Sequence, residues 1–130
     1  MQFLQPPGWP RPKGYACGVA ASGRQVHVSG MVGWDAAGTF HSDDFVAQAR
    51  QALENIVAVL REAGAQPEHI VRMTWYVLDK REYLDAGAAL GAAYRAVIGR
   101  HYPAMSALQV AGLMEEQARV EIEVTAVIPD

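Results

Sequence analysis

The last ten residues before the C-terminal Pro-Asp pair alternate between apolar and polar side chains. The apolar set is Val120, Ile122, Val124 and Ala126, and the polar set between them is Glu121, Glu123 and Thr125. Successive side chains of a strand point to opposite faces, so this pattern predicts a strand over 119–128 with one buried face. The rest of the chain must supply an apolar layer that covers this face.

The first such layer is an amphipathic helix over 45–63, where apolar residues recur at helical spacing. Ser42 offers an N-cap, and Asp43 and Asp44 would then place carboxylates in the first turn. Gly64 follows the last apolar position and predicts the end of the helix, because glycine readily adopts the left-handed conformation of a C-terminal cap.

A second helix is expected from Asp79 to about Gly99. Asp79 can cap its first turn, and Glu82, three residues later, completes the pattern of a capping box. Gly87 and Gly91 lie inside this helix, where each costs about 1 kcal/mol relative to alanine. We expect close packing of the helix against a sheet to compensate for that cost.

Four further apolar segments have the length and residue types of strands. The segments 15–21 and 25–30 are separated by a polar break that contains Gly23, which predicts a hairpin. Segment 70–78 is rich in β-branched and aromatic residues and predicts a central strand, and segment 105–110 is also extended. With the last strand, the predicted order is ββαβαββ.

This order predicts an α+β fold in which a mixed β-sheet carries two helices on one face, within a single domain over 1–130. Residues 1–13 contain four prolines and predict an irregular N-terminal arm. The other sheet face has no helix to cover it. We expect this face to carry Val, Leu and aromatic residues, and a large patch of them cannot remain in water. Self-association is therefore the simplest way to bury it.

Composition excludes several classes of function. The net charge is -3 and no run of Lys or Arg is present, so nucleic acid is not an expected partner. No segment approaches the roughly eighteen apolar residues of a membrane span. Cys17 is the single cysteine, residues 1–13 lack an apolar signal-peptide core, and His27, His41 and His69 have no metal-ligand spacing. A cytoplasmic protein without a metal is predicted.

Several short motifs also resemble a known family. They are Ala-Gln-Ala-Arg-Gln-Ala-Leu-Glu-Asn-Ile at 47–56, Glu-Ala-Gly at 62–64, Tyr94, Tyr-Pro-Ala at 102–104 and Val-Glu-Ile-Glu at 120–123. Their order and spacing resemble the Rid (YjgF/RidA) family. The resemblance implies a chorismate-mutase-like fold, a homotrimer with a central barrel, small-molecule clefts between subunits, and no cofactor.

Many members of that family hydrolyse enamines or imines of 2-oxo acids and release ammonia. The resemblance assigns Glu121 to the orientation of the attacking water, as a carboxylate can act as a general base. Tyr15 matches a tyrosine at the mouth of the cleft. On its own strand Glu121 is equally a solvated glutamate on the polar face, and Tyr15 is equally an interface residue.

The chain departs from the family pattern at the cleft. Met105 stands where deaminating members have an arginine that holds the substrate carboxylate, and a thioether cannot replace two charged donors. Met31 follows Gly30 where the family often has glutamine, and Gly91 aligns with an asparagine. The predicted cleft is therefore more apolar, and the usual imino-acid substrate is in doubt.

A replacement cation could come from Arg100 or His101, which directly precede the Tyr-Pro-Ala motif. The alternative is that this pair interacts favourably with the C-terminal end of the second helix. The interaction with the helix end is the favoured interpretation.

The leading functional hypothesis is a cofactor-independent hydrolase of an enamine, imine or related metabolite. Its alternative is a trimer that binds a small molecule without chemistry, in an apolar pocket made by Met31, Trp34 and Met105. A ribonuclease activity is not supported by a chain of net charge -3 without a basic patch.

Overall fold

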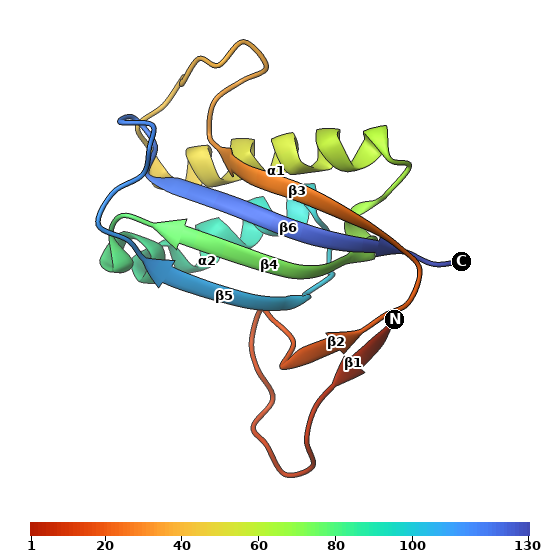
Figure 1. Cartoon of the computed structure of the whole chain (residues 1–130). Coiled ribbons are helices and arrows are strands. Elements are labelled where there is room, and N and C mark those ends of the chain that lie inside the picture. Colours follow the sequence, from red (N-terminus) through yellow and green to blue (C-terminus); the bar gives the residue numbers. More distant parts are fainter.

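A computed structural model describes all 130 residues (Figure 1). The elements along the chain are β1 (Gln2–Leu4), β2 (Gly18–Ala20), β3 (Arg24–Val32), α1 (Phe45–Glu62), a 3-10 turn (Pro67–His69), β4 (Ile70–Val77), α2 (Lys80–Val97), β5 (Ala104–Gln109) and β6 (Val120–Ile128). The main sheet has the strand order β3-β6-β4-β5. Only β4 and β5 are parallel, and both helices cover the same face, which confirms the predicted mixed α+β architecture.

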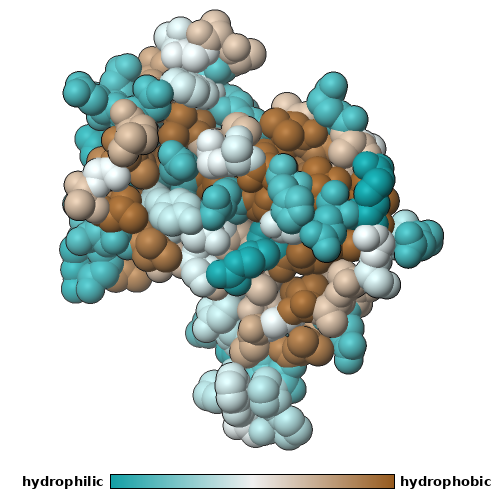
Figure 2. All heavy atoms as spheres, viewed as in Figure 1, coloured by the Kyte–Doolittle hydropathy of each residue, from teal (hydrophilic) through white to brown (hydrophobic).

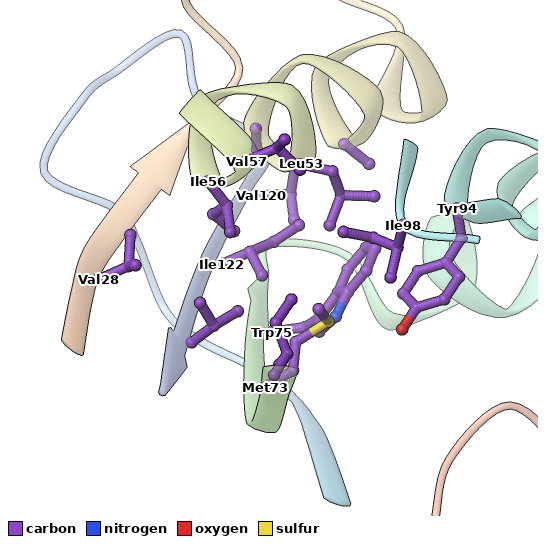
Figure 3. Close-up of a cluster of buried hydrophobic side chains, with 14 of the residues drawn as sticks. Val28, Leu53, Ile56, Val57, Met73, Trp75, Tyr94, Ile98, Val120 and Ile122 are labelled. Carbon is purple, nitrogen blue, oxygen red and sulfur yellow. The ribbon is translucent and has the colours of Figure 1, made fainter. Parts of the chain in front are cut away.

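The core lies between the helices and the sheet. The apolar residues of β6 are buried as the alternation predicts, and Ile122 is fully inaccessible to solvent. In Figure 3, Leu53 and Ile56 of α1 point toward Val120 and Ile122. Burial of such side chains is worth about 1.5–3 kcal/mol each, so this layer is a main source of stability.

Helix α1 begins at Phe45 as predicted, but its N-cap lies two residues after the predicted cap at Ser42. Asp44 is the N-cap, and its carboxylate accepts a hydrogen bond from the Ala47 amide at 2.9 Å. Ser42 instead accepts from the Asp44 amide. Because Asp43 and Asp44 both precede Phe45, no acidic residue occupies the first turn, contrary to the prediction. The end is as predicted, because Gly64 adopts φ +75° just after the last turn.

Helix α2 confirms Asp79 as the N-cap, which accepts hydrogen bonds from the amides of Arg81 and Glu82. The capping box is not closed, because the Glu82 carboxylate pairs with Arg119 at 3.3 Å. Gly87 has φ +36° and kinks the helix, and no atom from outside the adjacent helix backbone lies within 4 Å of where its Cβ would be. The prediction that close packing explains Gly87 is therefore wrong.

The predicted N-terminal hairpin does not form. Strand β2 pairs with β1, whereas β3 pairs with β6 from Arg24 opposite Ile128 onward. Between the two strands, Gly23 has φ +143° and lies so close to the Ile128 backbone that a Cβ would collide with it. The long partner β6 offers nine residues for pairing, which a short hairpin cannot match. The proline-rich arm is consequently not irregular throughout, since it contains β1.

The sheet face without helices is largely polar, contrary to the prediction of an apolar face. The β4–β6 register places Thr74 opposite Glu123 and Tyr76 opposite Glu121 on this face, with Leu108 at its edge. Figure 2 shows teal polar residues interspersed among apolar ones over this side of the molecule. The apolar residues of the strands point to the helices instead, so this face gives no hydrophobic reason for self-association.

Neither helix is long and apolar enough to cross a membrane.

Candidate functional site

Glu121 lies on the open face of β6, where it is half-buried. A β-bulge in β3, at the register shift between Val28 and Met31, places Gly30 beside it. A Cβ on residue 30 would collide with the Glu121 carboxylate, so glycine leaves the space that this carboxylate occupies. The Glu121 side chain makes no hydrogen bond within the chain, and its oxygens are free to accept from water or a ligand.

The neighbouring carboxylate is already engaged. The Tyr76 hydroxyl donates to Glu123 Oε1 at 2.6 Å. This hydrogen bond, followed by desolvation and the charges of Glu123 and Glu121, raises the pKa of Tyr76 above its usual value. Tyr76 therefore remains a donor at neutral pH, and Glu121 is the carboxylate of this face that is available for chemistry.

A cavity of about 570 Å³ lies on the other side of the sheet, between α2 and the edge strand β5. Its apolar and aromatic walls include Trp75, Tyr83, Leu90, Tyr94, Tyr102 and Met105. Figure 3 labels two of them, Trp75 from β4 and Tyr94 from α2. The volume is within the range of about 300–1,000 Å³ that is typical of small-molecule sites.

The aromatic walls are held by specific contacts. The rings of Tyr94 and Tyr102 stack with centroids 5.5 Å apart, and Trp75 meets Tyr83 edge-on at 6.0 Å. The Tyr94 hydroxyl donates to the His101 carbonyl at 2.6 Å. Burial, and secondarily Tyr102, raises the pKa of Tyr94 well above its usual value, so its hydroxyl stays protonated and uncharged.

The expected site residues divide into two groups within one chain. Met105 and Gly91 line the cavity on the helix side, where Met105 lies opposite Met73 in the β4–β5 register. Glu121 and Gly30 lie together on the opposite face of the sheet. One ligand molecule cannot contact both groups of the same chain.

The apolar pocket expected from Met31, Trp34 and Met105 is not assembled within one chain. Met31 packs against the core from β3. The Trp34 ring packs on the Phe40 ring with centroids 5.7 Å apart. The Asn55 amide donates to the Trp34 carbonyl at 2.8 Å and so stabilises this segment. Neither lines the cavity that contains Met105.

The two candidates for a replacement cation lie elsewhere. Arg100 lies with Tyr15 in a separate surface depression near the N-terminal strands. His101 donates from Nε2 to the Ile70 carbonyl at 2.6 Å, and its ring meets Phe3 edge-on. Neither lines the cavity with Met105, so the structure gives His101 a structural role.

Sequence reasoning missed the two cations that do line the cavity, Lys13 and Arg95. A signal for Arg95 was present, because it follows Gly91 by four residues and so lies on the same helix face. Lys13 had no such signal, since a loop brings it to the cavity.

No three His, Cys, Asp or Glu side chains converge as a metal site would require. Cys17 interacts with Gln5, and His41 pairs with Asp35 at 2.6 Å.

Together, these features define a small α+β protein with a mainly apolar cavity between a helix and an edge strand. The endoribonuclease L-PSP family model matches residues 10–128. A 2-iminobutanoate/2-iminopropanoate deaminase of Salmonella typhimurium is 35% identical over 81% of this chain and 80% of its own length. The goat enzyme of the same name is 34% identical over 80% of this chain and 73% of its own.

Solved structures give the same result. A Rid-family protein from Yersinia pestis superposes with a TM-score of 0.86 at 33% identity over 98% of both chains. RidA from an Antarctic Psychrobacter species has a TM-score of 0.69 at 32% identity, over 98% of this chain and all of its own. The chain therefore belongs to the Rid family, also called the YjgF or endoribonuclease L-PSP family, as its sequence motifs predicted.

Proposed function

We propose that this protein is a cofactor-independent hydrolase that deaminates an enamine, an imine or a related metabolite. The observation that carries the proposal is the free Glu121 carboxylate beside Gly30. The names of the relatives at 34–35% identity support it, since both are 2-iminobutanoate/2-iminopropanoate deaminases.

In the proposed reaction Glu121 accepts a proton from a bound water, and the water oxygen attacks the carbon of the C=N bond. The resulting tetrahedral adduct then loses its nitrogen as ammonia after that nitrogen is protonated. An imine and one water thus become a carbonyl compound and ammonia. No oxidant, metal or organic cofactor is consumed in this balance.

The separation of Glu121 from Met105 is the reason to propose an interfacial site. If copies associate so that the β5 edge of one chain approaches the Glu121 face of the next, both groups can contact one ligand. We propose the homotrimer that the family resemblance implies. Sedimentation velocity should give a trimer at micromolar concentration, and a monomer would remove the basis for an interfacial site.

The decisive experiment measures ammonia release from freshly generated 2-imino acids. We expect turnover by the wild type and its loss in Glu121→Gln, which keeps the shape but cannot accept the proton. Glu116→Gln is the matched control, because Glu116 is exposed in a loop before β6. Equal turnover by Glu121→Gln would refute the role of Glu121.

A second candidate function is a ligand-binding trimer without chemistry. It is favoured by Met105, an uncharged thioether in a mainly apolar cavity. This alternative predicts saturable binding with no product detected by mass spectrometry. A gain of imino-acid turnover in Met105→Arg would then show that the scaffold is intact and serves another ligand.

A further inference from the structure

The charges around the cavity are of one sign. Lys13 and Arg95 are its only charged lining residues, and no Asp or Glu lines it. This local excess is opposite to the net charge of -3 of the whole chain. A cavity lined by cations beside low-dielectric walls concentrates anions.

Gly91 leaves room for the Arg95 guanidinium at the cavity. An ideal Cβ on residue 91 would lie 3.1 Å from Arg95 Nη1, which is closer than most Cβ contacts. The guanidinium therefore lies over the helix turn at Gly91, where a larger residue would displace it. The glycine that disfavours the helix thus makes room for the cation.

The Arg95 guanidinium also lacks a partner. Four other arginines are engaged within the chain. Arg24 donates to the Ala63 carbonyl, Arg72 donates to the Ser106 hydroxyl, Arg50 pairs with Glu54, and Arg119 pairs with Glu82. Arg95 makes no side-chain hydrogen bond or ion pair. All five of its N–H donors remain available, in the fork geometry that matches a carboxylate.

The cavity walls determine which kind of group the rest of the ligand can carry beside its carboxylate. Stacked Tyr94 and Tyr102, with Trp75 and Met105, give aromatic and thioether surface that suits a planar apolar group. The volume of about 570 Å³ is ample for a benzene ring with a short acid chain. A very small, wholly polar anion would leave this surface unused.

We propose that this cavity binds small carboxylates with an aromatic or bulky apolar body, and that Arg95, positioned by Gly91, supplies the counter-charge that Met105 does not. The proposal rests on the proposed function only in taking the cavity as the ligand site. It concerns binding and holds with or without turnover.

Isothermal titration calorimetry with phenylacetate tests it, with phenylacetamide as the neutral analogue of the same shape. We expect saturable phenylacetate binding and at least about tenfold weaker binding of the amide, the scale of one charge-assisted pair. Arg95→Gln should remove this preference. Arg81→Gln, an exposed arginine at the start of the same helix, should bind like the wild type.

A second variant tests the guanidinium without deleting it. Gly91→Asp places a carboxylate four residues before Arg95, where it can pair with the guanidinium and repel the ligand. It should abolish phenylacetate binding. Ala92→Asp adds the same charge at the next, exposed position and should have little effect.

Equal affinity for the acid and the amide would overturn the proposal, as would unchanged binding by Arg95→Gln or no saturable phenylacetate binding at millimolar concentration. Thermal melting of each variant confirms that it is folded. Glu121→Gln separates the two ideas, since loss of ammonia release with intact phenylacetate binding supports both. Binding that depends on Arg95 in a protein without any turnover would leave this inference standing and refute the deaminase.

Discussion

The carboxylate of Glu121 lies against Gly30, in the space that a Cβ on residue 30 would occupy. The bulge in β3 creates this contact by bringing Gly30 beside β6. The position of the proposed water-orienting group is thus set by the residue on the neighbouring strand.

Gly30→Ala should consequently displace the Glu121 carboxylate. We expect ammonia release to fall by up to about a hundredfold, because displacements near 1 Å can cost that much in rate. Stability should change by less than about 1 kcal/mol, since the displaced atoms end a flexible side chain. Gly112→Ala is the control, because nothing lies within 4 Å of its Cβ position. Equal rates for the two variants would show that the contact has no role in turnover.

Gly33→Ala should affect folding instead. Its Cβ would lie 2.6 Å from Gln48 Cα, so the backbone of α1 would have to move. Overpacking of this kind costs about 1–3 kcal/mol. Urea denaturation measures the loss, and an unchanged midpoint would contradict the close approach of Gly33 to α1.

Gln48 is a buried polar residue that connects three loop groups. Its amide donates to the carbonyls of Ser42 and Gln117 at 2.9 Å each, and its oxygen accepts from the Arg119 amide at 2.8 Å. Gln48→Leu leaves these groups unpaired, and we expect a loss of about 3 kcal/mol in the free energy of unfolding. Gln51→Leu, which removes one hydrogen bond along the same helix, should cost about 0.5 kcal/mol. Comparable losses of stability in Gln48→Leu and Gln51→Leu would argue against the role of Gln48 in connecting the loops.

Alkaline pH should destabilise the protein through its buried tyrosines. Burial raises the pKa of both Tyr94 and Tyr83 in the folded state. Their contribution is therefore complete below the unfolded pKa of about 10 and is lost as the pH rises above it. Urea midpoints between neutral pH and about pH 11 should fall. Tyr94→Phe should lower stability at neutral pH, because its hydrogen bond is lost, but flatten the alkaline decline. An identical alkaline decline in the wild type and in Tyr94→Phe would contradict the contribution of Tyr94 to it.

The sequence by itself determined the elements whose signals are local. The alternation around Ile122 predicted a strand with one buried face, Gly64 predicted the end of α1, and Asp79 predicted the start of α2. Each depends on residues within a few positions, because side-chain periodicity and capping act over one or two turns. The family motifs predicted the fold in a different way, through their resemblance to the Rid family.

Only the tertiary structure decided which segments and side chains meet. Strand β3 pairs with β6, and β2 pairs with β1 instead of with β3. No local pattern in the sequence indicates this choice between distant partners. The same holds for Glu121 and Met105, which the sheet separates onto opposite faces, and for Lys13, which a loop brings to the cavity that Arg95 also lines. Long-range pairing depends on the free energy of the whole assembled sheet, so it is fixed only when the chain is folded.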